Sequence, residues 1–265
     1  MSFKGLVSAL AFVAFLPGIA VAETPDTSEQ PQADAANAEE TEAASSPYGS
    51  FSATLTAVSD YRDRGISQTD EQPALQGSLD WAHDSGVYAG VWASNVDFND
   101  GGEADFELDT YLGYATEWAG FDWDFMVNGI FYPGASDALD YDLVEFSASV
   151  GRSFDIVNTK ALVIYSPDNS GDSGTGIYGK LSADAPIKET GFGLTAAVGH
   201  QYVEDTVRYG VPSYNDWSAG VTYSWQTVDF KLEYIDTDLS EGECADGCDA
   251  TAMLTISHKF GGGEE

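Results

Sequence analysis

The chain has 265 residues, and its 44 Asp and Glu residues against 10 Lys and Arg residues give a formal net charge of −34 at pH 7. This balance argues against nucleic acid or an anionic membrane surface as a partner, because both attract Lys and Arg. It indicates cations as partners, or a surface kept soluble by charge repulsion. The length allows one large all-β domain or two small ones.

Residues 1–22 have the pattern of a cleaved secretory signal peptide. Lys4 precedes an apolar run over residues 6–16, and residues 20–22 form an A-x-A cleavage site, so the mature chain is expected to begin at Glu23. The alternative, an uncleaved anchor, is disfavoured because the run is shorter than the about 20 apolar residues that a membrane-spanning helix needs.

Residues 23–48 are predicted to form a disordered acidic tether. Residues 23–47 contain no aromatic and no large aliphatic side chain. They cannot bury enough apolar surface to offset the entropy of ordering the chain, so a solvated linker is favoured over a partner-binding segment. Residues 49–260 are predicted to be the folded domain, and residues 261–265 a short C-terminal tail.

The folded domain shows the two-residue period of β-strands and no stretch with helical periodicity. The predicted strands are residues 50–60, 74–83, 86–97, 104–118, 121–132, 141–153, 155–165, 174–184, 192–203, 214–226, 228–237 and 250–260. They number roughly twelve, and each is near the ~10 residues that a tilted strand needs to cross a bilayer. Strands of soluble proteins average only about 5 or 6 residues.

The connections between these strands alternate in length. The short connections are 83–86, 119–120, the point around Phe154, 185–190 and 226–227. Every long connection follows an odd-numbered strand, as in bacterial outer-membrane barrels, whereas a soluble β-sandwich has no reason to keep this alternation. The sequence therefore predicts a roughly 12-stranded antiparallel transmembrane β-barrel with both termini in the periplasm.

The segment from Asp105 to Tyr132 shows the two faces of one hairpin, with apolar side chains on one parity and acids on the other. In a membrane barrel the apolar face contacts lipid and the acids face a water-filled interior. Trp81, Trp217 and Trp225 lie close to strand ends, which is typical of aromatic girdles at the two membrane interfaces. The side chains predicted to face lipid are Phe106, Leu108, Leu112, Trp118, Phe121, Trp123 and Phe125.

The two cysteines, Cys244 and Cys248, lie in a long connection. An exported protein meets an oxidising compartment, so a small disulfide loop is predicted. A zinc site is the weaker alternative, because two sulfur ligands without a nearby histidine are half of such a site. No metal and no other cofactor is predicted.

Segment 55–98 carries a recognisable set of residues. They are Ser59-Asp60-Tyr61, Arg64-Gly65-Ile66-Ser67, Pro73-Ala74, Gly86, Tyr88-Ala89-Gly90 and Trp92-Ala93-Ser94-Asn95. This segment resembles the TorF family of proteobacterial proteins, which are proposed to be porins. The resemblance implies an outer-membrane β-barrel with a pore function, and it brings no catalytic residue and no defined substrate. Beyond Phe98 the resemblance is in the pattern of residues and not in shared motifs.

Side chains on the polar parity are predicted to line the pore. Carboxylates there would raise the local cation concentration and disfavour anions. The alternative is that polar side chains simply fill a small barrel through hydrogen bonds and ion pairs, with no path through it. The predicted pore-lining residues are Asp80, Asp105, Glu107, Asp109, Asp122, Asp124, Glu145, Lys180, Asp229, Lys231 and Glu233.

Arg62 and Arg64 stand out in the first long connection, because the chain has few basic residues. If this connection folds inward, both would face carboxylates across a constriction and select solutes by size and charge. Otherwise they lie in an exposed loop and pair with neighbouring acids. Gly65 is expected to supply a tight turn.

No catalytic site is predicted. His83, His200 and His258 lie in separate strands or strand ends, and the residues two positions from His200 are Val198 and Tyr202. A nucleophile beside a histidine on the same face is therefore not indicated.

The sequence thus predicts a porin-like channel, not an enzyme, for passive diffusion of small hydrophilic, cationic or neutral solutes through the outer membrane. One alternative is a narrow or plugged barrel that acts through its acidic extracellular loops. Another is a soluble secreted β-protein. The expected partners are outer-membrane lipid, the barrel-assembly machinery and small solutes, without nucleic acid, and the oligomeric state is left open.

Overall fold

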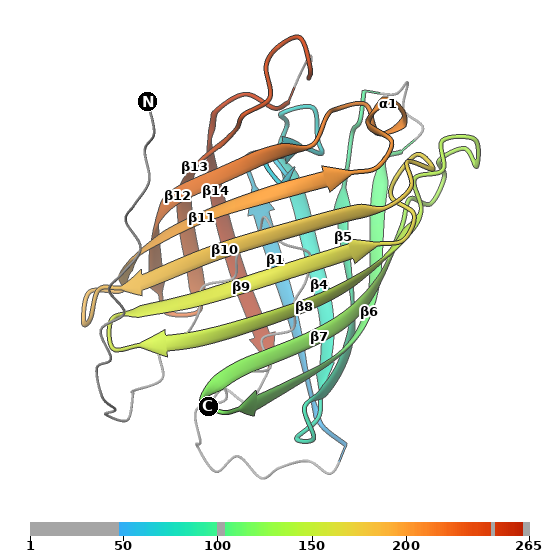
Figure 1. Cartoon of the computed structure of the whole chain (residues 1–265). Helices are drawn as coiled ribbons and strands as arrows, with labels where there is room; N and C mark the ends of the chain where they lie inside the picture. Colours follow the sequence, from blue (N-terminus) through green and yellow to red (C-terminus); the bar gives the residue numbers. More distant parts are fainter. Residues whose placement is uncertain (1–47, 100–103, 245–246, 262–265) are drawn as a thin grey trace, which may run out of the picture.

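The computed structural model describes residues 48–99, 104–244 and 247–261 (Figure 1). The predicted signal peptide, residues 23–47 of the predicted tether and residues 262–265 of the predicted tail lie outside the described residues. Within the described ranges, twelve strands form one closed antiparallel barrel. The strand β1 pairs with β4 on one side and with β14 on the other, which closes the barrel.

The barrel strands have nearly the predicted bounds. They are β1 (Ser50–Val58), β4 (Ala74–Ala82), β5 (Val87–Asn95), β6 (Phe106–Trp118), β7 (Phe121–Phe131), β8 (Leu143–Phe154), β9 (Val157–Ser166), β10 (Gly176–Pro186), β11 (Phe192–Val203), β12 (Tyr214–Trp225), β13 (Val228–Thr237) and β14 (Thr251–Gly261). Each end lies within two residues of its predicted position. The strand prediction is therefore confirmed.

The two ends of the barrel differ in the length of their connections. Short turns, such as residues 119–120 and 226–227, join the strands at one end, which we call the turn end. The longer connections, such as residues 59–73 and 238–250, gather at the other, the long-loop end (Figure 1). Ser50 and Gly261 both lie at the turn end, because β1 begins and β14 ends there.

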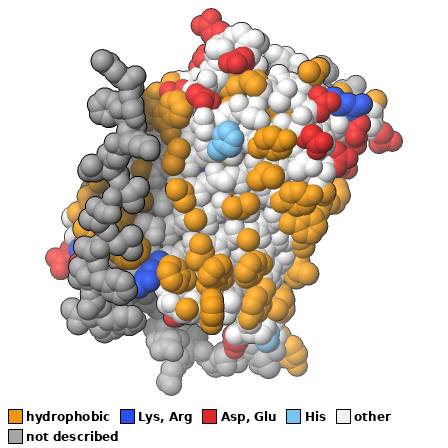
Figure 2. Space-filling model, in the orientation of Figure 1, with side chains coloured by type: hydrophobic (Ala, Val, Ile, Leu, Met, Phe, Trp, Pro, Cys, Tyr) orange, Lys and Arg blue, Asp and Glu red, His pale blue; other side chains and the backbone are white. Residues whose placement is uncertain are grey.

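The wall of the barrel is apolar outside and polar inside. In β6, Phe106, Leu112 and Trp118 are 43%, 53% and 69% exposed, whereas Glu107 and Asp109 are almost fully buried. Figure 2 shows hydrophobic side chains spread over the outer wall. This is the reverse of a water-soluble β-protein, and a membrane-spanning barrel needs this arrangement because lipid surrounds it.

Large aromatic side chains gather on the outer wall near the turn end. Their positions at strand ends match the aromatic girdle of a membrane interface. They are Phe51, Trp81, Trp118, Phe121, Trp123, Phe154, Phe192, Tyr223, Trp225, Phe230 and Phe260. Of the predicted lipid-facing residues, Leu108, Phe121 and Trp123 are half-buried on this outer face, and Phe125 is exposed.

Two small elements were not predicted from the sequence. The strands β2 (Arg62–Asp63) and β3 (Ile66–Ser67) form a hairpin in the connection between β1 and β4. A single helical turn, α1 (Thr206–Tyr209), lies between β11 and β12, and the Asp205 side chain caps its first amides. No helix in the described part of the chain is long and apolar enough to cross a membrane.

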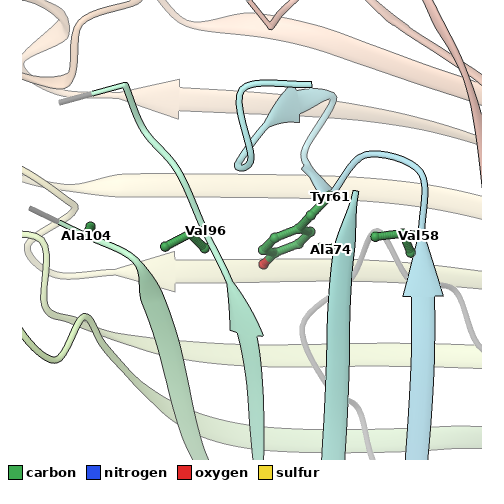
Figure 3. Close-up of a cluster of buried hydrophobic side chains, with 5 residues drawn as sticks. All are labelled: Val58, Tyr61, Ala74, Val96 and Ala104. Atoms are coloured by element: carbon green, nitrogen blue, oxygen red, sulfur yellow. The ribbon is translucent and has the colours of Figure 1, made fainter. Parts of the chain in front are cut away.

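A buried apolar cluster lies at the long-loop end, where β1 and β5 end and β4 begins. It consists of Val58, Tyr61, Ala74, Val96 and Ala104. Figure 3 shows the Tyr61 ring between Val96 on one side and Ala74 and Val58 on the other. Tyr61 also meets Trp92 edge to face, with 5.5 Å between the ring centroids. This cluster fixes the base of the first long connection.

Candidate functional site

The connection between β1 and β4, residues 59–73, folds into the lumen, and we call it the plug. Its tip is the two-residue turn Arg64-Gly65 of the β2–β3 hairpin, where both residues have positive φ, 49° and 84°. Tight hairpin turns of this kind favour glycine, as was expected for Gly65. A Cβ added to Gly65 would lie 2.6 Å from Cγ2 of Thr237, so the tip abuts the inner wall.

Arg64 anchors the tip to the far wall of the barrel. Its Nη2 donates to both carboxylate oxygens of Glu145 on β8, at 2.7 and 2.9 Å, and its Nη1 donates to Gln201 on β11 at 3.0 Å. The guanidinium also lies 5.0 Å from the ring centroid of Tyr178 on β10. Burial lowers the pKa of Arg64, but the charges of Glu145, Asp63 and Tyr209 and the hydrogen bond to Glu145 together outweigh it and hold this pKa well above its usual value.

Arg62 anchors the base of the plug and is only 1% exposed. Its Nε donates to Asp60 at 2.6 Å, within the plug. Its Nη1 donates to the carbonyl oxygens of Gly247 at 2.8 Å and Asp249 at 3.0 Å, in the connection between β13 and β14. Further acceptors are the Gly65 carbonyl at 3.1 Å and the Glu71 carboxylate at 3.3 Å. A buried guanidinium is tolerated only when its donors are paired in this way.

Two tyrosines hold Glu107 on β6: Tyr61 belongs to the plug, and Tyr132 directly follows β7. The Tyr61 hydroxyl donates to one carboxylate oxygen at 3.0 Å, and the Tyr132 hydroxyl donates to the other at 2.9 Å. Burial and the Glu107 charge hold the pKa values of both tyrosines well above the usual value. Both hydroxyls therefore keep their protons and remain donors.

The remaining acids of this half of the lumen are also enclosed. Asp109 on β6 accepts from the Asn128 amide on β7 at 2.7 Å, and both residues are 0% exposed. Asn128 lies directly across the strand pair from Glu145. Because a water-filled passage would expose inward-facing side chains, the plug and its partners close the lumen at the long-loop end.

The lumen near the turn end is more open to solvent. Tyr88 donates to both Asp124 oxygens at 2.8 and 2.9 Å, and Tyr111 donates to Asp80, so some acids here are still paired. The inward-facing charged residues that remain half-buried or exposed are Asp80, Glu117, Asp122, Asp124, Lys160, Asp184, Asp229 and Lys259. We call this half of the lumen the vestibule. Carboxylates outnumber basic side chains in it.

The predicted pore-lining residues therefore occupy four different places. Glu107, Asp109 and Glu145 surround the plug, and Asp80, Asp122, Asp124 and Asp229 line the vestibule. Lys180, Lys231 and Glu233 are buried on the inner wall, and Lys231 pairs with Glu233 at 2.9 Å. Asp105 is exposed and lies one residue before β6, so it belongs to the long-loop rim and not to the barrel wall.

The first part of the TorF-like set, residues 59–73, lies in the plug, and the later part lies at the start of β4 and along β5. Asp60 holds Arg62 and accepts from the Ser67 hydroxyl at 2.6 Å, and Arg64 and Gly65 form the tip. Ser59 bridges to Leu254 of β14, since the Leu254 amide donates to its hydroxyl at 2.9 Å. Whether any of these residues selects a solute stays a prediction.

A disulfide joins Cys244 to Cys248, as the sequence predicted. Within the described residues no group of three or more His, Cys, Asp or Glu side chains is arranged to hold a metal ion. The three histidines lie at separate places: the His200 Nδ1 is 2.9 Å from the side-chain oxygen of Asn215, and that of His258 is 2.7 Å from the Thr227 carbonyl.

A family model described as a bacterial protein of unknown function, Gcw_chp, matches residues 41–260. The chain belongs to this family. The narrower resemblance to the TorF family stays a prediction. A search of the curated proteins finds no match.

Several solved barrels are similar in fold. The NanC porin aligns with a TM-score of 0.51 at 9% identity, covering 79% of this chain and 98% of that one. The KdgM porin aligns with a TM-score of 0.50 at 6% identity, covering 80% of this chain and 98% of that one. An outer membrane channel from Pseudomonas putida F1 covers 85% and 100%, at 10% identity and a TM-score of 0.49. At these identities the first two matches support the barrel fold alone.

Proposed function

We propose that this protein is an outer-membrane channel for passive diffusion of small hydrophilic solutes, cationic or neutral, and that the plug controls its lumen. The long loops would face the cell exterior, and the turn end and both termini would face the periplasm. The proposal rests on one observation. A vestibule lined by carboxylates leads from the turn end to a buried plug, which an ion pair anchors to the wall.

The apolar outer wall supports a place in a lipid bilayer, and the fold shared with two porins supports the channel class. The excess of lumen carboxylates supports preference for cations, because a negative potential concentrates counter-ions and repels anions. No residue is needed for chemistry, since the solute crosses unchanged.

The test is single-channel current in a planar bilayer under a KCl gradient. It compares the native protein with a plug-less variant, in which two glycines replace residues 62–67. Both proteins are first shown to be folded and inserted by heat-modifiable migration on gels. We expect rare openings for the native protein, and discrete steps with a reversal potential favouring K⁺ for the plug-less variant. A plug-less variant that is folded, inserted and silent would sink the channel proposal.

The second candidate is a closed barrel that acts through its acidic loops. The observation that favours it is the complete burial of Asp109, Asn128 and Gln201 beside the plug. The same bilayer experiment separates the two candidates, because a channel shows openings in the native protein, whereas a barrel that acts only through its loops is silent with its plug in place.

A further inference from the structure

The segment Gly247–Asp249, in the connection between β13 and β14, lies against the plug. The Gly247 carbonyl accepts from Nη1 of Arg62 and from the Ser67 amide, both at 2.8 Å. The Asp249 carbonyl accepts from the same Nη1 at 3.0 Å. A Cβ added to Gly247 would lie 3.0 Å from Cβ of Ser67, so the two backbones are in close contact.

This segment is held in place from both sides. Thr237, the last residue of β13, donates its hydroxyl to the Cys248 carbonyl at 3.0 Å. The disulfide ties Cys248 to Cys244, whose amide donates to the Ser240 carbonyl at 3.0 Å. A cross-link of this kind restricts the conformations open to a long connection. The disulfide therefore helps to present the two carbonyl groups to Arg62.

Arg62 depends on these carbonyl groups because it is buried. Two of its acceptors, Gly247 and Asp249, come from this segment, and neither the plug nor the barrel wall supplies them. If the segment moves away, Nη1 keeps only the Gly65 carbonyl at 3.1 Å. A buried charged donor without its partners is strongly unfavourable, so the guanidinium would move to water and take the plug with it.

We propose that Gly247–Asp249, tied by the Cys244–Cys248 disulfide, is a latch that holds the plug in the lumen, and that reducing this disulfide opens the channel. The inference rests on the proposed channel function. A dithiol supplies the two electrons and two protons: the Sγ–Sγ bond breaks, each cysteine Sγ gains a hydrogen, and the dithiol becomes a cyclic disulfide. The latch lies at the long-loop end, so the reductant acts from that side.

The test uses the full barrel in a planar bilayer. The open fraction is measured for the native protein, for the double variant Cys244→Ser with Cys248→Ser, for Arg62→Gln and for the plug-less variant. Arg208→Gln is the matched control, because Arg208 is exposed and pairs with Asp172 and not with a residue of the plug. In a second measurement, the native protein is inserted first and a dithiol is then added on one side of the bilayer.

We expect the cysteine double variant and Arg62→Gln each to raise the open fraction by about tenfold or more, as loss of one hydrogen bond to a charged group would. The dithiol should do the same from the long-loop side, and Arg208→Gln should match the native protein. If the plug-less variant conducts while the disulfide-free and reduced proteins stay closed, the latch proposal is wrong and the channel proposal is retained. If no variant conducts, the channel proposal itself fails. Should the double variant not insert, the dithiol measurement alone decides.

Discussion

The two halves of the lumen are built from the same alternation of residues and yet differ in their access to water. Near the turn end, Asp80, Asp124 and Lys160 remain half-buried, whereas near the long loops Glu107, Asp109 and Glu145 are sealed. The wall does not cause this difference, because both halves have inward-facing acids on neighbouring strands. The plug causes it, by bringing two arginines and Tyr61 into one half only. In this barrel, one connection sets how far solvent enters.

The largest expected effect comes from Glu145→Gln, which removes the anion that Arg64 faces. Removing one partner of a buried ion pair destabilises the folded arrangement by about 3 to 5 kcal/mol, because the other charge stays buried without compensation. The plug should leave the lumen to return Arg64 to water, and the open fraction in single-channel records should rise to near that of the plug-less variant.

Glu241→Gln is the matched control for this change, because Glu241 is exposed in a long connection. Adding Arg64→Gln to Glu145→Gln should cost less than the sum of the single changes, since the two groups form one interaction. An unchanged open fraction in Glu145→Gln would show that the ion pair does not hold the plug.

The next effect concerns solvent access at two matched serines. Ser147 is 8% exposed on the inner face of β8 beside the plug level, and Ser182 is half-buried on the inner face of β10. With Ser182→Cys, a charged thiol reagent added at the turn end should label quickly. With Ser147→Cys, labelling should be much slower until the plug is removed. Equal rates in the native plug background would remove the distinction between the two halves.

A smaller effect is expected from Gly65→Ala at the plug tip. An L side chain at this positive φ costs about 1 to 2 kcal/mol, and the new Cβ would meet Thr237. The plug should loosen, and the open fraction should rise moderately. Gly120→Ala is the control that carries the backbone strain without a side-chain contact. Gly120 has φ 75°, but no atom lies within 4 Å of its added Cβ. If both changes act alike on the open fraction, the plug contact is not the cause.

The smallest effect is expected on ion selectivity. In the plug-less variant the lumen is hydrated, so one carboxylate contributes roughly 1 kcal/mol or less to the energy of a nearby ion. Asp109→Asn should shift the reversal potential slightly toward zero, whereas Asp105→Asn, at the exposed rim, should leave it unchanged. A larger shift of the reversal potential in Asp105→Asn than in Asp109→Asn would show that the carboxylates that select ions lie in the loops.

The strands of the barrel wall were predictable because the same residue pattern recurs in each of them. Each strand shows alternation with period two, and each turn separates two such runs, so local pattern located every barrel strand and its outer face. The disulfide was predictable from the spacing of Cys244 and Cys248 in an exported chain. These features depend on neighbours in sequence.

The plug was predictable only in part, because its contacts are distant in sequence. Arg62 and Arg64 drew attention as rare cations, but nothing local showed that Arg64 would reach Glu145, 81 residues away. The carbonyl groups of Gly247 and Asp249 left no signal at all, since every residue has a backbone carbonyl. Tyr61 and Tyr132 were missed as partners of Glu107, and a search for tyrosines near lumen acids would have found them as candidates.

The seam between β1 and β14 joins the two ends of the described barrel. Ser59 exchanges hydrogen bonds with Leu254 across this seam, and Arg62 reaches carbonyl groups 185 and 187 residues further along the chain. These partners can meet only after the last strand has paired with the first. The plug that follows β1 is therefore among the earliest parts of the barrel to be synthesised and among the last to form all of its contacts. Closing of the lumen would then be one of the last steps of barrel assembly.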